Sequence, residues 1–224
     1  MRHFFLDQLG LINDPVDVHH ISRVLRMNVG DRISCAYNGN RFVGEIESIS
    51  KTEVEVKLLE KIEVPTYPEI HLYQALAKGQ KLEAILQHGT ELGISKFGLF
   101  PSEFSDIKKV DKKRDRYERI IKDAAKQSQG SFIPKLDFYN GVGELEFDEN
   151  YIFLCYEAHK ETHIKLDGPG SVAIIIGPEG GFSKEEVDYL SQKAKLVSLG
   201  TRILRTETAG LVATTAVLKE LGIL

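Results

Sequence analysis

The chain has 224 residues, of which 42% are hydrophobic and 28% are charged, proportions typical of a globular protein that can bury a sizeable core. Its 29 Lys and Arg residues against 33 Asp and Glu residues give a formal net charge of −4. Composition therefore does not indicate nucleic-acid binding, and any RNA site would have to be a local basic patch.

The two cysteines, Cys35 and Cys155, are far apart in the sequence, which favours reduced thiols of a cytoplasmic protein over a disulfide scaffold. The first residues include Asp7 and Asp14 and form no extended apolar run, so no signal peptide is predicted. No apolar run approaches the roughly 18 residues of a membrane helix, and no membrane partner is expected.

Residues 1–67 are predicted to form a small β-rich domain. Asn38-Gly39 is a strong hairpin signal between two of its strands. Strict alternation of apolar and polar residues predicts another strand that follows. Several short strands at close spacing predict a compact barrel with one helix. The expected strands cover residues 4–6, 33–37, 41–49 and 53–58, and the expected helix covers residues 18–25.

Four residues of this domain are candidates for RNA contacts: Arg2, His20, Arg23 and Arg26. Arg23 and Arg26 stand three apart on the predicted helix, a spacing that would let them meet neighbouring phosphates from one face. Residues 1–67 hold eight Arg and Lys against ten Asp and Glu, so bulk charge gives no support. A solvated helix face with a salt bridge at its rim is the alternative.

Pro65 and Pro68 enclose a short, stiff linker, which we take as the boundary between domains 1–67 and 68–224. Strands then alternate with helices, which predicts an α/β domain with a largely parallel sheet. The strands are expected at residues 70–76, 97–100 and 151–155, and the helices at 81–92 and 111–129. The inner face of the second helix is predicted to carry Tyr117, Ile120, Ile121, Ala124 and Ser128.

Two other kinds of chemistry find little support in the sequence. His159 and His163 stand four apart, with Glu157 and Glu161 interleaved, but no further Cys or His cluster accompanies them, so no metal site is predicted. The absence of a G-x-S-x-G motif, or of any other serine nucleophile with partners, disfavours covalent hydrolysis.

The C-terminal fifty residues contain the same unit twice, a buried strand followed by a Gly-bearing loop and a helix. In the first unit the strand 172–176 precedes the loop 177–181, and Ser183 with Glu186 forms a predicted capping box. In the second unit the strand 197–199 precedes the loop 200–205, and Thr206 is the predicted N-cap. The closing helix is rich in small residues, which suits close backbone packing.

Such loops commonly bind polyphosphates, because backbone N–H groups and helix dipoles attract anions. The spacing here is neither G-x-G-x-x-G nor a Walker A loop, which disfavours a dinucleotide-dependent dehydrogenase. Glu179 lies within the first loop, where a carboxylate repels phosphate but tolerates a sugar hydroxyl or a cationic ligand. That both loops are only tight connections remains an alternative.

The motifs GPEGG followed by F-S-x-E-E, and LGxRILRTETA, resemble those of the SPOUT-superfamily methyltransferases that modify 16S ribosomal RNA at uracil N3. HHISRVLRMNVGD resembles the N-terminal block of that family and QALAKGQKLEAILQHGTELGI its central block, so the resemblance covers essentially the whole chain. It implies a PUA-like RNA-binding domain, a SPOUT domain with a trefoil knot, S-adenosylmethionine as cofactor and a homodimer. The implied target is uracil-1498 of the small ribosomal subunit.

The resemblance also implies site residues. Arg205 or Arg202 would stabilise the imide anion of the uracil, and Glu207 is a candidate proton acceptor, although a helix-start carboxylate on the dipole is equally compatible with its position. Gly180 is expected at positive φ, in space that the ligand needs. The implied cofactor contacts are Gly177, Gly180, Gly181, Leu199, Gly200, Ile203, Leu204 and Thr206.

The sequence departs from the family at three places. Lys126 stands where an acidic residue is usual, Gln129-Gly130 where an arginine usually follows, and Phe104 where an arginine is common. These changes put individual RNA contacts in doubt but do not touch the cofactor loops. Methylation of another ribosomal or transfer RNA position, and a non-catalytic RNA-binding protein, stay open as alternatives.

Overall fold

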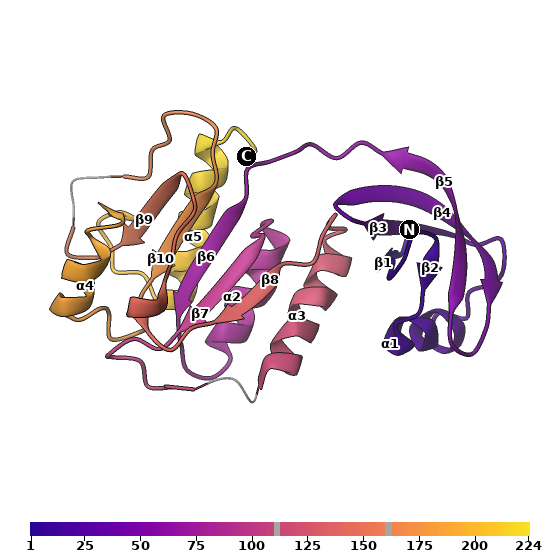
Figure 1. Ribbon diagram of the computed structural model, residues 1–224, viewed down its shortest axis with the longest axis horizontal. Coiled ribbons are helices and arrows are strands. Elements are labelled where there is room, and N and C mark those ends of the chain that lie inside the picture. The colour runs from indigo at the N-terminus through magenta and orange to yellow at the C-terminus, as the bar shows by residue number, and fades with distance from the viewer. Residues whose placement is uncertain (110–112, 160–162) are drawn as a thin grey trace. The chain divides into compact units, whose positions relative to one another are not determined.

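The computed structural model describes residues 1–109, 113–159 and 163–224, which divide into two units, each with its own hydrophobic core (Figure 1). Unit 1 comprises residues 1–66 and 125–133, and unit 2 comprises residues 67–124 and 134–224. Within the described residues no helix is long and apolar enough to cross a membrane. Of the sequence features discussed above, Asp111 at the start of the predicted second helix and Glu161 lie outside the described residues.

Unit 1 is built on a mixed five-stranded sheet, as expected of the small β-rich domain. The strand order is β1-β3-β4-β5-β2, with β1 and β3 parallel and the remaining neighbours antiparallel. Its strands are β1 (His3–Phe5), β2 (Leu11–Ile12), β3 (Arg32–Tyr37), β4 (Asn40–Ile49) and β5 (Val54–Ile62).

The hairpin between β3 and β4 confirms the Asn38-Gly39 signal. Tyr37 pairs with Asn40, so the two residues between them form the whole turn. Both have positive φ, 47° at Asn38 and 76° at Gly39, which is the backbone that a two-residue turn between right-twisted strands requires. The turn thereby fixes the register that buries Ile33 and Ile46 on one face.

The helical segment of unit 1 begins three residues earlier and ends one residue earlier than predicted. α1 (Pro15–His19) begins after Asp14, whose carboxylate accepts from the backbone N–H groups of Val16 and Asp17, and it continues as the π-helix η1 (His20–Val24). Arg26 lies beyond the helix with a φ of 52°. The prediction that Arg23 and Arg26 share one helix face is therefore wrong.

Residues 125–133 are held to the rest of unit 1 by two buried polar contacts. The His3 Nε2 donates to the Gly130 carbonyl at 2.9 Å, which leaves Nδ1 to accept from the Ser34 hydroxyl at 2.8 Å. Burial lowers the pKa of His3 to about 4, so the ring is neutral. Lys126 forms an ion pair with the buried Asp17, which explains a basic residue at this position.

Unit 2 is built on six parallel strands in the order β11-β9-β10-β6-β7-β8, which confirms the parallel α/β domain. β8 was not predicted, and β11 begins and ends two residues earlier than expected. The strands are β6 (Ile70–Ala75), β7 (Lys96–Phe100), β8 (Lys135–Phe138), β9 (Tyr151–Cys155), β10 (Val172–Ile176) and β11 (Lys195–Val197).

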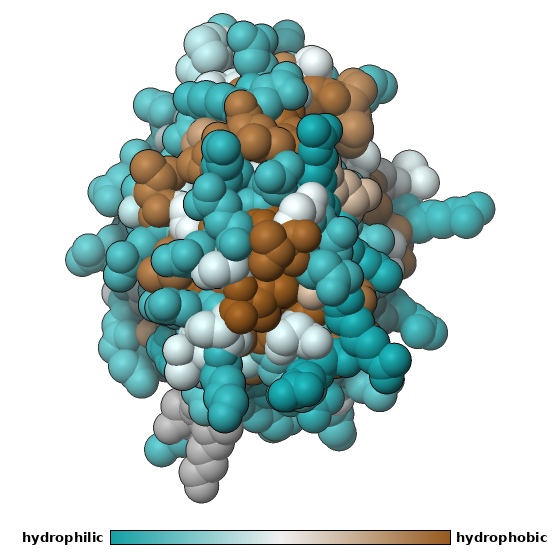
Figure 2. Space-filling view, turned by 90° about the vertical axis from the view of Figure 1, so that its right-hand side faces the viewer, coloured by the Kyte–Doolittle hydropathy of each residue, from teal (hydrophilic) through white to brown (hydrophobic). Residues whose placement is uncertain are grey.

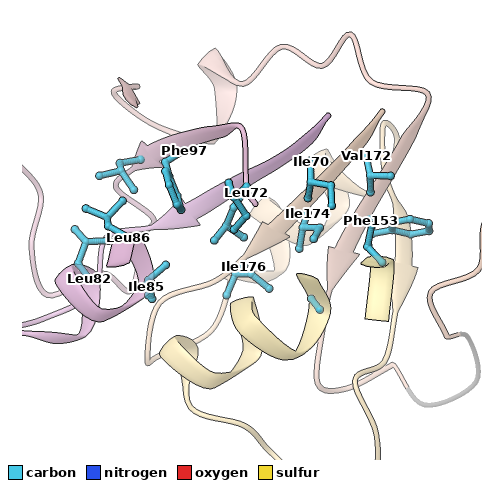
Figure 3. Packing of buried hydrophobic residues seen from close by; sticks show 14 of the residues in the cluster. Ile70, Leu72, Leu82, Ile85, Leu86, Phe97, Phe153, Val172, Ile174 and Ile176 are labelled. Carbon is cyan, nitrogen blue, oxygen red and sulfur yellow. The ribbon is translucent and has the colours of Figure 1, made fainter. Parts of the chain in front are cut away.

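Helices cover both faces of this sheet, which explains why β10 is apolar at every position. Ile174 and Ile176 pack in one cluster with α2 (Lys81–Glu91) and α5 (Thr206–Glu220), and Figure 3 shows Ile174 next to Ile70 and Leu72, and Ile176 on the side of Ile85. Ile175 belongs to the cluster on the other face, which contains Val187 and Leu190 of α4 (Lys184–Leu190). A short 3-10 helix, η3 (Val142–Glu144), precedes β9.

α3 (Arg114–Gln127) also contributes to the first cluster, through Tyr117 and Ile121. The predicted inner face is wrong in one respect, because Ser128 is exposed and lies beyond the end of the helix. The chain reverses there through Gln129, whose φ is 56°.

A buried carboxylate joins the amino ends of the strands of unit 2. Glu149, whose side chain is 2% exposed, accepts from His71 Nδ1 at 2.5 Å and from the Tyr73 hydroxyl at 3.0 Å. Burial alone would raise the pKa of Glu149, but the hydrogen bonds from His71 and Tyr73 outweigh it and hold that pKa below its ordinary value of 4.5. Burial raises the pKa of Tyr73, so its hydroxyl remains a donor.

We expect Glu149→Gln to lower the free energy of unfolding by about 1–3 kcal/mol at neutral pH, because it leaves buried donors without their carboxylate. A carboxyl whose folded pKa is depressed stabilises the fold above its unfolded pKa, and this contribution is lost as the pH falls through the folded value. The variant should therefore lose less stability than the wild type between pH 6 and about pH 3. Urea unfolding at several pH values measures this, with the exposed Glu146→Gln as control; parallel pH profiles for wild type and Glu149→Gln would contradict it.

Candidate functional site

The two Gly-bearing loops of unit 2 meet at the carboxyl ends of its strands. The loop 177–183 follows β10 and leads into α4, and the loop 198–205 follows β11 and leads into α5. In a parallel sheet these ends lie at one edge, where ligand sites of α/β folds are found. The segment 156–159 follows β9, the strand between β10 and β11 in the sheet, and leaves from the same edge.

Thr206 fastens one loop to the other. Its hydroxyl donates to the Gly177 carbonyl at 2.6 Å and accepts from the amide of Gln74 at 2.9 Å. Gln74 is fully buried in β6, and its amide also reaches the Ala75 carbonyl at 2.9 Å. The predicted N-cap role of Thr206 is wrong, because Arg205 occupies the N-cap position of α5 and no side chain caps this helix. The threonine hydroxyl instead bridges β6, the first loop and α5.

A cavity of about 580 Å³ lies between the loops. A smaller one of about 80 Å³ adjoins it and shares five lining residues with it, Cys155, Glu157, Ile203, Leu204 and Ala209. The larger cavity is also lined by Lys81, Ile176, Gly177, Pro178, Glu179, Gly181, Phe182, Arg205 and Thr206, and the smaller one by Tyr156, Ser198, Leu199, Gly200, Thr201 and Arg202.

The structure thus brings together most of the residues that the sequence indicated. Two of the predicted residues, Gly180 and Glu207, line neither cavity. Ile203 is 84% exposed, so its side chain forms a rim of the site and not an enclosed wall. The remaining predicted cofactor residues, and both Arg202 and Arg205, line one cavity or the other.

Gly180 has a different role from the one expected. Its φ is not positive, and a Cβ there would lie 2.8 Å from the Cβ of Phe104, so the glycine permits close packing of Phe104 on the loop. The positive φ values occur at Gly181, with 74°, and at Gly200, with 119°. A Cβ at Gly181 would lie 3.1 Å from the Glu157 carboxylate, so this glycine keeps the space between the loop and that side chain.

Lys81, at the start of α2, neutralises the acidic residue of the first loop. Its ammonium group lies 2.8 Å from the Glu179 carboxylate, which also accepts from the Lys78 backbone N–H at 3.2 Å. Burial would raise the pKa of Glu179, but the Lys81 hydrogen bond and the backbone donors outweigh it and lower that pKa. The same hydrogen bond raises the pKa of Lys81. Sequence reasoning missed both Lys81 and Gln74, because neither belongs to a loop with a recognisable ligand pattern.

Glu157 is the second carboxylate of the site and lines both cavities, and within the described residues it has no hydrogen bond or ion pair. The capping box that was predicted at Ser183 and Glu186 is confirmed. Glu186 accepts in addition from the Ser102 hydroxyl at 2.8 Å and the Glu103 N–H at 2.9 Å. The carboxylate therefore ties the loop after β7 to the start of α4.

Glu207 lies in the first turn of α5, and its Oε2 is buried with no hydrogen-bond partner in the described part of the chain. Its position is compatible with both roles considered above, a carboxylate on the helix dipole and a proton acceptor. Among the residues that the structure covers, no group of three His, Cys, Asp or Glu side chains is arranged to hold a metal ion.

The site suits a cationic ligand with a flat apolar part better than a polyphosphate. Ile176, Phe182 and Leu204 supply apolar surface, and the glycines expose backbone groups to a ligand. The unpaired Glu157 carboxylate would repel phosphate and attract a positive charge. Arg205, on the loop after β11, adds a positive charge to the same cavity, where it would attract a second, negatively charged molecule.

Both parts of the chain resemble RNA methyltransferases. A family model described as an RNA methyltransferase domain matches residues 65–218, and one described as an RNA methyltransferase PUA domain matches residues 12–59. The chain is 35% identical over 223 residues to the ribosomal RNA small subunit methyltransferase E of Bacillus subtilis, covering 90% of this chain and 86% of that protein. It is 31% identical over 201 residues to the enzyme of that name from Aquifex aeolicus, covering 86% and 87%.

Solved structures agree with the fold. A Legionella pneumophila protein solved with bound S-adenosylmethionine has 29% sequence identity and a TM-score of 0.84, over 98% of this chain and 97% of that one. A ribosomal RNA small subunit methyltransferase E from Neisseria gonorrhoeae, also bound to S-adenosylmethionine, superimposes with a TM-score of 0.83 at 24% identity, over 98% and 97% of the two chains.

The bridge at Thr206 predicts that the two loops are ordered together. Thr206→Val keeps the shape of the side chain but removes the hydroxyl, so the buried Gln74 amide and the Gly177 carbonyl lose a partner. We expect a loss of about 1–3 kcal/mol in the free energy of unfolding and faster hydrogen exchange in both loops, 177–182 and 198–205. Hydrogen exchange followed by mass spectrometry measures this.

Thr214→Val is the matched control. Thr214 lies fully buried in the same helix, but its hydroxyl donates only to the Gly210 carbonyl one turn earlier. Its removal should affect stability without changing exchange in the two loops. If Thr206→Val left exchange in both loops at the rate of this control, the bridge would not be what orders them.

Proposed function

This chain belongs to the RNA methyltransferase family, among the ribosomal RNA small subunit methyltransferases E, and from that premise we propose that it methylates 16S ribosomal RNA with S-adenosylmethionine at the N3 of one uracil. The observation that carries the proposal is the cavity between the loops, which the Thr206–Gly177 hydrogen bond holds together. The small ribosomal subunit is the proposed partner, and the cytoplasm the proposed location.

The residues of the cavity fit this cofactor. Apolar side chains that include Ile176 and Leu204 would contact the adenine, and Glu157 would attract the positive charge of the sulfonium or the amino group. When bound, S-adenosylmethionine supplies an electrophilic methyl group. The residues that we propose to hold it are Gly177, Gly180, Gly181, Leu199, Gly200, Ile203, Leu204 and Thr206. Of these, Gly180 lines neither cavity and packs against Phe104.

The protein's own residues must prepare the uracil. The N3 of uracil carries a proton, and its lone pair becomes available only as this proton leaves and negative charge spreads onto the two ring carbonyl oxygens. Arg205, on the rim of the larger cavity, is placed to stabilise that charge, with Arg202 beside the smaller cavity as the other candidate. Glu207 or water would accept the proton. Because N3 is paired in a duplex, the target has to be unpaired or flipped.

Three further features belong to the proposal. They are a trefoil knot in the methyltransferase domain, a homodimer, and a domain boundary that places residues 1–67 in the RNA-binding domain and 68–224 in the catalytic domain. Partly exposed apolar residues of α5, such as Val212 at 38%, offer a surface that a second copy would cover. Sedimentation of the full chain tests the dimer directly.

We expect S-adenosylmethionine to stabilise the protein against unfolding, by roughly 2.7 kcal/mol at a hundredfold excess over Kd, and NADH and ATP to have no such effect. Mass-spectrometric mapping of small-subunit RNA, prepared with and without this protein, should then show one added methyl group on a uracil. Equal stabilisation by NADH, or methylation of a nucleotide other than uracil, would overturn the assignment.

Arg205→Ala should slow methyl transfer by about a hundredfold or more while leaving S-adenosylmethionine affinity nearly unchanged, because the arginine acts on charge that develops in the uracil. Single-turnover rates at saturating RNA measure the effect, and calorimetry measures cofactor binding. Arg202→Ala is the comparison variant. A larger loss in Arg202→Ala would exchange the roles of the two arginines, and normal rates in both would exclude an arginine from this step.

A further inference from the structure

Unit 1 contains a cavity of about 740 Å³ that lies between its helix and the turn after β4. One wall comes from the start of α1 and from η1, and the other from the end of β4 and the turn that leads to β5. It is lined by Asn13, Pro15, Val18, His19, Ser22, Arg23, Ile49, Ser50, Lys51 and Thr52. No residue of the methyltransferase cavity takes part in it.

Four of these side chains are donors without a partner. Asn13, His19, Arg23 and Lys51 are all exposed, and within the described residues none has a side-chain hydrogen bond or ion pair. The hydroxyls that line the same cavity are engaged, because Ser22 donates to the Val18 carbonyl and Ser50 to the Glu53 carbonyl. The unsatisfied groups of the cavity are therefore its nitrogen donors, and Arg23 and Lys51 are positively charged.

The carboxylates nearest in sequence do not neutralise these donors. The Asp14 carboxylate accepts from backbone N–H groups at the start of α1, and Asp17 is buried and paired with Lys126. Glu53, two residues from Lys51, forms no ion pair with it within the described residues. Elsewhere in unit 1 a basic side chain is engaged, since Arg41 donates to Gln129 at 2.8 Å. Arg23 and Lys51 thus carry uncompensated charge at the cavity, although residues 1–67 as a whole are acidic.

The cavity also has apolar surface. Ile49 is half-buried and Pro15, at the first turn of α1, is exposed, so these two residues supply it, whereas Val18 is 3% exposed and offers almost none. Figure 2 looks onto the side of Figure 1 on which β5 and α1 are drawn, and it shows several hydrophobic patches, one of them near the middle, among hydrophilic residues. An apolar surface edged by donors suits a flat, partly apolar group that carries polar edges and a nearby negative charge.

We propose that this cavity binds one unpaired nucleotide of the substrate RNA, with the base against Pro15 and Ile49 and the adjoining phosphates on Arg23 and Lys51. The inference rests on the proposed function, and it adds where unit 1 contacts the RNA and that the contacted nucleotide is unpaired. A paired base offers no free face, so the nucleotide comes from a loop, a bulge or an end. Asn13 and His19 are placed to donate to the edge of the base or to its ribose.

This assignment separates the four residues that the sequence indicated for RNA. Arg23 lines the cavity. The others do not: Arg26 lies past the end of the helix, His20 contacts the Phe4 ring with centroids 6.3 Å apart, and Arg2 belongs to the segment before β1. Lys51, which the sequence did not indicate, is the second proposed phosphate contact, the role that had been expected for Arg26.

The double variant Arg23→Ala, Lys51→Ala tests the proposal in the full-length protein. The probe is the small ribosomal subunit purified from cells that lack this methylation. We expect at least a tenfold higher Kd near 0.15 M salt, and a smaller salt slope by roughly 0.7 for each phosphate that the variant no longer neutralises. KM for the subunit should rise, while kcat at saturation and the Kd of S-adenosylmethionine stay at their wild-type values.

Lys57→Ala, Lys61→Ala is the matched control, because it removes the same charge from exposed positions on β5 of the same unit. Equal losses in the two double variants would mean that only net charge matters, and would overturn the cavity as a site. Unchanged affinity and salt slope in Arg23→Ala, Lys51→Ala would overturn it as well. Either result can occur while the wild type still methylates uracil, so it is distinct from failure of the proposed function.

A photocrosslinking residue at Thr52 provides the second measurement. Thr52 lines the cavity and is exposed, so the replacement is expected to leave the fold intact. Irradiation of the complex with the small subunit should give crosslinks to one unpaired nucleotide, identified by mass spectrometry. Crosslinks spread over helical RNA, or found on ribosomal proteins in place of RNA, would contradict the proposal.

Discussion

The hydrogen bond from Thr206 to the Gly177 carbonyl is the contact that holds the two loops of the larger cavity together. It joins the end of β10 to the start of α5, two segments separated by α4 and β11 in the sequence, and Gln74 holds the same hydroxyl from β6. All three groups are buried or nearly so, where an unpaired polar atom costs more than at the surface. The hydrogen bonds thus join two irregular loops through one side chain, and a reaction that depends on alignment requires such a fixed arrangement.

Of the two carboxylates that line the larger cavity, one is paired with a lysine and the other is not. Glu179 would make the first loop anionic, but Lys81 neutralises it, and the pair closes one side of the site. Glu157 remains unpaired within the described residues, so negative charge lies on the loop after β9, and Arg205 lines the same cavity from the loop after β11. Charges of both signs in one cavity support the proposed transfer of a methyl group from a positive sulfur to the anionic N3 of uracil.

Local patterns in the sequence predicted the elements that local physics determines. The hairpin at Asn38-Gly39, the capping box at Ser183 and the buried strand 172–176 depend on neighbouring residues, and the structure confirms each of them. What failed depends on distant partners. Thr206 looks like an N-cap until the Gly177 carbonyl is brought within reach, and Gly180 looks like a position that needs positive φ until the packing of Phe104 accounts for the glycine. The spacing of residues along the sequence cannot predict contacts between such distant residues.

The same argument explains how an acidic chain can bind RNA. Net charge counts every ion, but a cation that is already paired contributes little to a phosphate site, because the carboxylate beside it cancels its field at short range. In this protein Lys126 is paired with Asp17, Lys81 with Glu179 and Arg116 with Glu83. Arg23, Lys51 and Arg205 have no such partner within the described residues, and each lines a cavity. What determines anion binding is therefore the position of the unpaired cations, which composition does not report.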